Sequence, residues 1–365
     1  MRIGILGGGQ LGRMLALAGY PLGLRFRVLD PAPEAPAGDV APHEAAPYAD
    51  EAALSRFAEG LDVVTYEFEN VPVAAARALA RRLPVRPAPD VLEAAQDRLV
   101  EKRTFEALGI PIPPFAPVDS RADLDAALAR IGLPAVLKAR RGGYDGKGQA
   151  VLRDGADVEA AWRALGGSPL LLEGFVPFER ELSVLAARGL DGDVRVYPLV
   201  ENVHRGGVLR RSLAPAPSGE RWQAEAERYA RAVLARFDYV GVLAIELFEA
   251  SGRLLANEMA PRVHNSGHWT IEGAETSQFE QHVRAVAGLP LGAARPRGHA
   301  AMLNLVGGHP DPAALLRVEG LHLHLYRKAP RPGRKIGHVT LVEADAGRLA
   351  ARLASIEPIV AQAER

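Results

Sequence analysis

The sequence LPAVLKARRGGYDGKGQAVL, residues 133 to 152, carries the features from which the fold is best predicted. Two β-rich runs, 135–139 and 149–152, flank a loop that holds four glycines and Lys147. Glycines let backbone N–H groups approach a phosphate without a Cβ in the way, and Lys138 and Lys147 add positive charge. The stretch therefore predicts two strands joined by a glycine-rich loop that binds phosphates. The alternative is a mobile hairpin whose charges are merely solvated.

The order of elements separates this loop from a Walker loop, which leads into a helix and reads GxxxxGK[ST]. The identity of its basic residues also argues for function. The chain uses arginine for most of its positive charge, and its lysines are Lys102, Lys138, Lys147, Lys328 and Lys335. Two lie in or beside this loop and two in a second basic loop, so a compact ammonium group is indicated at both.

Composition limits the classes of function. A chain of 365 residues with 48% hydrophobic residues predicts two or three domains with full cores. Its formal charge of zero predicts no general attraction to nucleic acid or membranes, so we expect small-molecule partners in local basic pockets. The absence of cysteine excludes disulfides, thiolate nucleophiles and cysteine-ligated zinc. No apolar run approaches the roughly 20 residues of a membrane span, and we expect a cytoplasmic protein.

Residues 1–96 predict an N-terminal Rossmann-like domain. A strand at 2–6, a glycine turn at 7–12, a helix to about residue 19 and a strand at 25–29 that closes with Asp30 match the fingerprint of a dinucleotide site. The same helix N-terminus can face any anion, so an NAD(P)-dependent dehydrogenase stays an alternative.

A buried strand at 63–66 is followed by Glu67 and Glu69. Ligands of open α/β sheets bind at such carboxyl ends, so either glutamate could contact a substrate. The alternative is an acidic cap for a helix at 71–83. Prolines at 84, 87 and 89 then indicate a domain boundary.

Residues 97–290 predict a second domain. The glycine loop is flanked by predicted helices at 99–108, 123–131 and 158–165 and by a predicted strand at 170–173. Residues of about 112–172 are therefore predicted to form a lid. Strands at 181–187 and 194–199 and a helix at 221–237 follow.

The stretch VGVLAIELFEASGRLLANEMA predicts a hairpin of strands 242–248 and 254–259, in which Glu246 and Glu258 share a face. Two carboxylates so placed repel unless a cation lies between them. Magnesium takes hard oxygen ligands together with substrate phosphates, and Asn257 or Asn265 could add an oxygen. An ordinary surface pair is the alternative.

Two histidine pairs invite a zinc interpretation. His264 and His268 lie four apart, but Ser266 and Gly267 disfavour a helix and no HExxH glutamate is present. His322 and His324 lie in an alternating strand without other ligands at metal spacing. We interpret His264 with Arg262 as an anion-handling pair instead.

Residues 291–365 predict a small β-rich C-terminal domain. Its loop KAPRPGRK concentrates Lys328, Arg331, Arg334 and Lys335 around proline and glycine, which preset turns and allow close backbone approach. In a neutral protein this density indicates a phosphate receptor.

With these motifs in place, the chain resembles the ATP-grasp superfamily, and within it the ligases that carboxylate aminoimidazole ribonucleotide in purine biosynthesis. The resemblance runs nearly end to end through GGGQLGRM, DRL at 97–99, KARRGGYDGKGQ, YPLVENVH, NEMAPRVHNSGHW and RPGRKIGH. It implies an α/β and α+β chain: a Rossmann-like pre-ATP-grasp domain, an ATP-grasp domain with its lid, and a small barrel-like C-terminal part.

The resemblance also assigns residues, motif by motif. It implies ATP contacts by Arg98, Lys138, Gly143, Tyr144, Asp145, Gly146, Lys147, Gly148, Gln149, Glu173, Gly174, Phe175, Val176, Glu181, His204, Asn257 and Glu258. It implies magnesium ligands Glu246 and Glu258, and ribonucleotide contacts Gln10, Leu11, Glu67, Asn265, Lys328, Arg334 and Lys335. Tyr144, Asp145, Arg262 and His264 would line the bicarbonate and carboxyl-transfer site.

The implied reaction converts bicarbonate and ATP to carboxyphosphate, which carboxylates the amine of aminoimidazole ribonucleotide. A lid that excludes water and charges that hold phosphates suit such chemistry. The resemblance further implies a homodimer and a hand-off of the product to an N5-carboxyaminoimidazole ribonucleotide mutase. A formate-using glycinamide ribonucleotide transformylase is the nearest alternative ligase, and a non-catalytic nucleotide-binding regulator is the alternative from another class.

Overall fold

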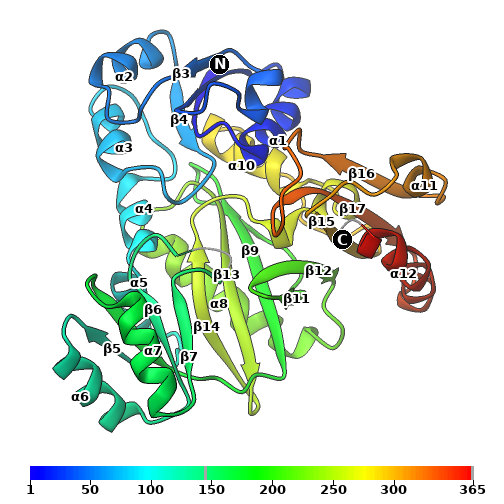
Figure 1. Cartoon of the computed structure of the whole chain (residues 1–365). Helices are drawn as coiled ribbons and strands as arrows, with labels where there is room; N and C mark the ends of the chain where they lie inside the picture. The colour runs from blue at the N-terminus through cyan, green and yellow to red at the C-terminus, as the bar shows by residue number, and fades with distance from the viewer. Residues whose placement is uncertain (144–145, 363–365) are drawn as a thin grey trace.

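The structure, a computed structural model, describes residues 1–143 and 146–362 and combines helices with three sheets in its described part (Figure 1). The sheets follow one another along the chain. The first belongs to the N-terminal residues, the second to the predicted lid, and the third to the remainder. No helix in the described ranges combines the length and apolar character needed to cross a membrane.

The N-terminal sheet is parallel in the order β3-β2-β1-β4, as a Rossmann-like unit requires. Its strands are β1 (Arg2–Leu6), β2 (Arg25–Asp30), β3 (His43–Ala45) and β4 (Val63–Tyr66). The accompanying helices are α1 (Gln10–Gly19), η1 (Tyr20–Leu22), η2 (Pro36–Asp39), α2 (Glu51–Ala58), α3 (Val73–Ala80) and α4 (Pro89–Gln96). Every residue of β4 is buried, because helices cover both faces of the sheet.

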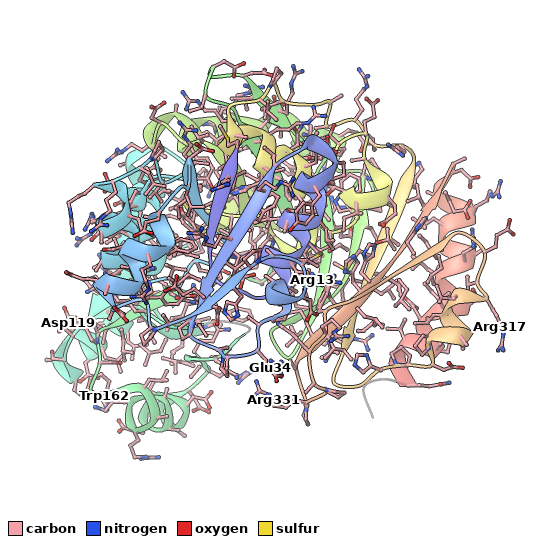
Figure 2. The ribbon with its side chains drawn as sticks, turned by 90° about the horizontal axis from the view of Figure 1, so that it is seen from above. Arg13, Glu34, Asp119, Trp162, Arg317 and Arg331 are labelled. Atoms are coloured by element: carbon pink, nitrogen blue, oxygen red, sulfur yellow. The ribbon has the colours of Figure 1, made fainter. Side chains whose placement is uncertain are left out.

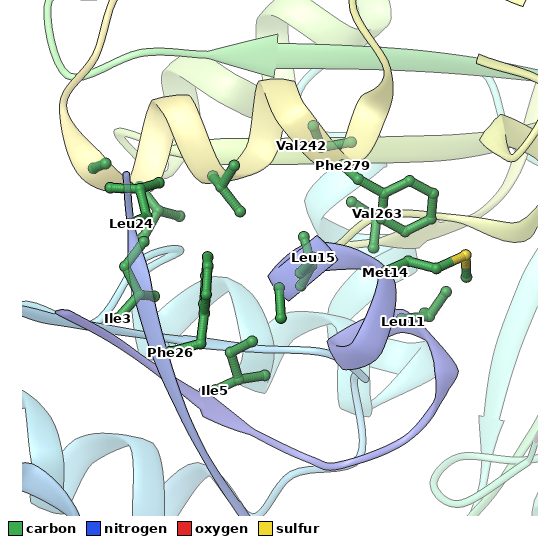
Figure 3. Close-up of a cluster of buried hydrophobic side chains, with 14 of the residues drawn as sticks. Ile3, Ile5, Leu11, Met14, Leu15, Leu24, Phe26, Val242, Val263 and Phe279 are labelled. Atoms are coloured by element: carbon green, nitrogen blue, oxygen red, sulfur yellow. The ribbon is translucent and has the colours of Figure 1, made fainter. Parts of the chain in front are cut away.

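An apolar core joins this unit to the rest of the molecule (Figure 3). Ile5 of β1 and Leu15 of α1 pack in one cluster with Val242 and Phe279, which come from the central sheet and from α10 (Gln278–Ala287). Tyr326 near the C-terminal strands belongs to the same cluster. The parts therefore share a core, and their faces are held together by burial of apolar surface.

The lid sheet is antiparallel in the order β5-β8-β6-β7. Its strands are β5 (Phe115–Val118), β6 (Ala135–Ala139), β7 (Gln149–Leu152) and β8 (Leu170–Gly174). Helices α6 (Arg121–Ile131) and α7 (Gly155–Leu165) pack on it through a separate small core. Helix α5 (Arg98–Ala107) precedes the lid and contacts the central sheet.

The central sheet runs in the order β14-β13-β9-β11-β12-β15-β17-β16, with β10 paired to β9. Its strands before residue 290 are β9 (Arg180–Arg188), β10 (Val194–Val196), β11 (Val200–Arg205), β12 (Val208–Ala214), β13 (Gly241–Ala250) and β14 (Arg253–Ala260). The long helix α8 (Glu220–Arg236) covers β9, β13 and β14, and η3 (Asn265–Gly267) and α9 (Thr270–Gly273) follow the last strand.

The C-terminal strands extend this sheet instead of forming a sheet of their own. They are β15 (His299–Val306), β16 (Leu321–Leu325) and β17 (Lys335–Glu343), with helices α11 (Pro312–Leu316) and α12 (Ala346–Ala361). Strand β15 pairs with β12 from Arg211↔Leu303 to Ala214↔Ala300. The expected barrel-like C-terminal part is therefore a β-rich extension, because β12 has an open edge that β15 completes.

Candidate active site

The glycine-rich loop is the predicted hairpin between β6 and β7, with Lys138 opposite Gln149. Gly146 has a left-handed φ of 75°, and a Cβ there would lie 3.1 Å from the Cα of Gly207. The loop thus passes closely over the turn between β11 and β12, and both this approach and the left-handed φ favour glycine. Tyr144 and Asp145, predicted to contact ATP and bicarbonate, lie outside the described residues.

Arg140 at the base of this hairpin has a structural partner. Its Nε and Nη2 donate to the two carboxylate oxygens of Asp97 at 3.0 and 2.7 Å, and the Nε of Arg141 lies 3.3 Å from the same carboxylate. Both arginines lie beside the glycines in the stretch that the sequence predicts to bind phosphates. The structure instead uses them to fix the loop to the start of α5, and Asp97 was not predicted as a site residue.

Lys138 and Glu173 form a buried ion pair on neighbouring strands, with Nζ and Oε2 separated by 2.8 Å. Burial alone would raise the pKa of Glu173, but the charges of Lys102 and Lys138 lower it to about 2. Its second oxygen, Oε1, is buried and has no hydrogen-bond partner within residues 1–143 and 146–362. Since buried polar atoms are normally satisfied, this oxygen is available to a ligand. Gly174 ends β8, and Phe175 and Val176 follow it, with Phe175 exposed.

The predicted pair of carboxylates is present, since Glu246 and Glu258 are direct Cα partners in the β13–β14 ladder. Each carboxylate also has a basic partner in the protein. Arg98 donates to Oε2 of Glu258 at 2.9 Å, and Nε2 of His264 lies 3.3 Å from Oε1 of Glu246. Burial would raise the pKa of Glu246, but His264 keeps it at about 2. His264 thus favours the ionised form of Glu246, while Glu258 pairs with Arg98.

The donor set nevertheless fits magnesium. Asn257 has no Cα partner between Ala256 and Glu258, so it forms a bulge, and bulges redirect side chains. Its Oδ1 is buried without a hydrogen-bond partner among the described residues, and Asn257 directly precedes Glu258 on the strand. Within residues 1–143 and 146–362, no group of three or more His, Asp or Glu side chains could hold a metal alone. One or two carboxylates completed by substrate phosphates is a typical magnesium environment.

His264 is oriented by buried hydroxyl groups. Its Nδ1 lies 2.8 Å from Oγ of Ser266, which in turn accepts a hydrogen bond from Oγ of Ser183 at 2.8 Å. Ser183 accepts from the amide of Asn202 at 2.9 Å. With Ser183 donating to it, Ser266 donates its own hydrogen to Nδ1, so the Nε2–H of His264 faces Glu246. The sequence did not predict this chain of polar residues.

Arg262 pairs with Glu69 rather than with His264. Its Nε donates to Oε2 of Glu69 in a short contact. Burial opposes ionisation of Glu69, yet Arg262 lowers its pKa to about 2. The predicted anion-handling pair therefore consists of two neighbouring basic groups, each with its own carboxylate.

Glu67 occupies the N-terminus of α1. Its Oε1 accepts from the backbone N–H of Gly9 at 2.5 Å and its Oε2 from that of Gly12 at 2.8 Å, while Asp30 accepts from Gly8 at 2.7 Å. Burial raises the pKa of Glu67, partly offset by these amides and by Lys328. A dinucleotide pyrophosphate would need the same amides. The dehydrogenase alternative therefore fails, and the acidic cap serves α1 rather than the helix after it.

The other predicted ribonucleotide contacts approach this region from three segments. Lys328 lies near enough to Glu67 to lower its pKa, and Lys335 does the same for Glu246. The basic loop also contacts the N-terminal unit through Arg327 and Asp39, 3.1 Å apart. Figure 2 shows Arg331 of this loop at the same edge as Glu34, seen from above.

The remaining predicted residues differ in accessibility. Asn265 exchanges two hydrogen bonds with Asn304, at 2.7 and 3.1 Å, and Arg334 donates within its own loop to Ala329. Gln10 is partly exposed at the start of α1, but Leu11 is only 8% exposed and packs in the shared core. A contact by Leu11 would therefore use its backbone. Glu181 and His204, predicted to contact ATP, lie 2.8 Å apart.

A cavity of about 510 Å³ lies elsewhere, between β10, the start of α8 and residues 293–296, and none of the predicted site residues that the structure describes line it. Several of the predicted residues instead follow one path. It leads from Lys138 and Glu173 through Arg98, Glu258, Glu246 and His264 to Glu69, Glu67 and Lys328. A glycine-rich hairpin over one sheet and paired carboxylates on another define an ATP-grasp ligase.

Comparisons with known proteins agree with this class. Residues 1–96 match the ribonucleotide synthetase preATP-grasp domain, 103–279 the ATP-grasp domain, and 300–352 the phosphoribosylaminoimidazole carboxylase C-terminal domain. An N5-carboxyaminoimidazole ribonucleotide synthase of Pseudomonas aeruginosa is 56% identical over 360 residues, 99% of each chain. The chain belongs to the N5-carboxyaminoimidazole ribonucleotide synthase family.

Solved structures give the same result. The N5-carboxyaminoimidazole ribonucleotide synthetase of Thermus thermophilus is 61% identical with a TM-score of 0.94, and each chain covers 98% of the other. The Aspergillus clavatus synthase in complex with ADP and 5-aminoimidazole ribonucleotide is 31% identical with a TM-score of 0.92. That similarity covers 99% of this chain and 98% of the Aspergillus chain.

Proposed function

We propose that the chain catalyses the ATP- and bicarbonate-dependent carboxylation of 5-aminoimidazole ribonucleotide. The products are N5-carboxyaminoimidazole ribonucleotide, ADP and phosphate. The observation that carries this proposal is the path of charges from the Lys138–Glu173 pair to Lys328, which provides for two phosphate-bearing substrates with a reaction region between them. Family membership supports the same reaction.

In the first step, an oxygen of bicarbonate bonds to the γ-phosphorus while the bond to ADP breaks, which gives carboxyphosphate. Lys138, Lys147 and Arg98 would hold the phosphates, and the amides of residues 143 and 146–149 would approach them closely. Magnesium bound by Glu246 and Glu258 would neutralise phosphate charge. Phosphoryl transfer depends mainly on such positioning, which the ion pairs around these side chains support.

In the second step, the exocyclic amine bonds to the carboxyl carbon, the carbon–oxygen bond to phosphate breaks, and the amine loses a proton. Arg262 and His264 lie beside Glu69 and Glu246, where they would orient bicarbonate in the first step and the carboxyl group of carboxyphosphate in the second. Tyr144 and Asp145 belong to the same proposal through the sequence motif. The carboxylates keep both basic side chains in fixed positions, which favours a reactive geometry.

The ribonucleotide would bind between the basic loop and the start of α1. Lys328, Arg334 and Lys335 would hold its 5′-phosphate, while Gln10, Leu11, Glu67 and Asn265 would contact the sugar and base. Proximity of Lys328 to Glu67 and of Lys335 to Glu246 supports one shared site.

Glu181, His204, Asn257 and residues 173–176 complete the proposed nucleotide site. We also propose the division into domains 1–96, 97–290 and 291–365, a homodimer, a cytoplasmic location and a product hand-off to the mutase. Of these, the homodimer is the most directly testable, by sedimentation equilibrium of the full chain.

Phosphate release measured with aminoimidazole ribonucleotide tests the function. We expect release to require ATP, magnesium and bicarbonate together, and omission of any one should abolish it. Replacing bicarbonate by formate, and aminoimidazole ribonucleotide by glycinamide ribonucleotide, tests the alternative ligase. Phosphate release that is indifferent to bicarbonate would contradict the carboxyphosphate route.

A further inference from the structure

Lys102 is fully buried, with 0% of its surface exposed. It lies on α5, among the few lysines of this arginine-rich chain, and no role follows for it from the sequence motifs. Lysine is almost never fully buried unless its charge is paired. Because Lys102 adds no charge to the surface, we expect its buried ammonium group to have a structural or functional role.

The ammonium group of Lys102 reaches two different sheets. Its Nζ donates to the backbone carbonyl of Asn257 on β14 at 2.7 Å, and it lies 3.4 Å from Oε2 of Glu173 on β8. Strand β8 belongs to the lid sheet and β14 to the central sheet. Lys138 contacts the same Glu173 oxygen, at 2.8 Å, from within the lid sheet.

Neighbouring residues of α5 hold the helix against the same strand. Arg98 donates to Glu258, and Glu101 accepts from the backbone N–H of Met259 at 2.6 Å. Positions 98, 101 and 102 lie on one helix face, since residues three and four apart are neighbours. Helix α5 is thus bound to three consecutive residues of β14, and Lys102 links that arrangement to β8.

We propose that Lys102 is a positioning residue for nucleotide binding, whose ammonium fixes the spacing between β8 and β14 and so holds Glu173 and Asn257 on opposite walls of the site. This rests on the proposed function, which assigns both residues to ATP. Lys102 itself lies behind these residues, in contact with them rather than with the nucleotide. Oε1 of Glu173 and Oδ1 of Asn257 are both buried without a hydrogen-bond partner in the part of the chain that the structure describes, which leaves each able to accept a hydrogen bond from a ligand.

The first test is the dissociation constant for ADP in the full-length variant Lys102→Met, measured by calorimetry without turnover. We expect it to rise at least about tenfold, because a charged hydrogen bond is worth about 1.5–3 kcal/mol. The KM for aminoimidazole ribonucleotide should change less than about twofold. Lys102→Gln keeps an N–H donor but removes the charge, and it provides the test if Lys102→Met does not fold. It should raise the dissociation constant for ADP at least about threefold.

A double-mutant cycle with Glu173→Gln tests the route of the effect. Because Lys102 would act partly through Glu173, the losses of the two single variants should not multiply, and the double variant should bind ADP more tightly than their product predicts. Independent, multiplying losses would overturn the proposal.

His282→Gln is the matched control, because His282 is also buried but joins Thr65 to Val242. It should lower the melting temperature and leave ADP affinity unchanged. Lys102 variants that lower only the melting temperature would overturn the inference. If Glu173→Gln also leaves ADP affinity unchanged, the nucleotide assignment itself fails, and the two failures are thereby distinguished.

Discussion

Glu258 connects Arg98 to the proposed magnesium site, so its replacement separates charge from shape. In Glu258→Gln we expect the half-saturating magnesium concentration to rise about ten- to a hundredfold, since a charged contact is worth roughly 1.5–3 kcal/mol. Initial rates at fixed ATP and varied magnesium measure this. Glu319→Gln, at an exposed C-terminal position, is the control, and an unchanged magnesium curve in Glu258→Gln would refute the assignment.

Lys328 and Arg334 belong to the basic loop, which is distant in sequence from the paired carboxylates. They are proposed to hold the 5′-phosphate of the ribonucleotide, whereas the carboxylates are proposed to hold magnesium. We expect Lys328→Ala or Arg334→Ala to raise the ribonucleotide KM about ten- to a hundredfold and to leave kcat and the KM for ATP nearly unchanged. Steady-state kinetics with both substrates varied check this. Arg317→Ala, an exposed arginine on the same part of the chain (Figure 2), should behave like the parent. An effect confined to ATP would contradict the phosphate role.

His282 makes stability depend on pH. Its Nδ1 accepts from the backbone N–H of Val242 at 3.1 Å, so the ring carries its proton on Nε2, 2.8 Å from the hydroxyl of Thr65. Burial lowers the pKa of His282 to about 4. The unfolded histidine has a pKa of about 6.5, so between these values the unfolded state binds more protons.

Stability from this group is therefore complete above about pH 6.5 and is lost as the pH falls toward 4, by up to about 3 kcal/mol. Urea denaturation at several pH values measures it. Burial also lowers the pKa of His268 and His338, so the His282→Gln variant should still lose some stability as the pH falls. The parent should lose stability more steeply than this variant. Equal slopes for parent and variant would show that His282 does not contribute.

At the scale of elements, Asp97 joins the glycine hairpin to α5. Asp97→Asn should keep the cap on Leu99, since asparagine caps helices well, but lose the ion pairs to Arg140 and Arg141. We expect tryptic cleavage after these arginines to accelerate about tenfold, and the KM for ATP to rise, because loss of a charged contact frees the base of the hairpin. Asp154→Asn, at the cap of α7, is the control. Cleavage at the parental rate would contradict this.

Local patterns predicted the elements that carry most of the chemistry. Alternation along β13 and β14 predicted that Glu246 and Glu258 share a face, and glycines between β-rich runs predicted the β6–β7 hairpin. Both predictions rest on residues that lie close together in the sequence. Strand β11 was missed because Glu201 and His204 interrupt its apolar pattern, and β12 because Arg210 and Arg211 interrupt its pattern. Helix α4 was missed because Pro89 at its start resembles a loop signal.

Partnerships over long distances in sequence could not be predicted. Glu67 lies 58 residues from Gly9, and Lys102 lies 155 residues from Asn257. Their contacts follow from the packing of one element on another, which composition and spacing do not encode. The scarcity of lysine was the one signal that could have singled out Lys102.

At the scale of the whole molecule, the N-terminal unit and the central sheet stabilise each other through their shared core. Phe279 is 2% exposed and packs with residues of the N-terminal unit (Figure 3). Phe279→Ala should lower the free energy of unfolding by about 3–5 kcal/mol, through lost burial and the cavity left behind. Urea denaturation gives the value, and Leu316→Ala, at a position 61% exposed, is the control. Comparable losses for the two variants would contradict the role of this core.

The continuous ladder from β12 to β15 also constrains how the architecture can evolve. A recombination event that exchanged the last third of the gene would have to restore the register from Arg211↔Leu303 to Ala214↔Ala300 for the central sheet to form. Loops tolerate substitution far more readily than paired strands. New substrate preferences should therefore arise by point changes in the segment that carries Lys328 and Arg334, while the strands on either side of it are inherited as one block.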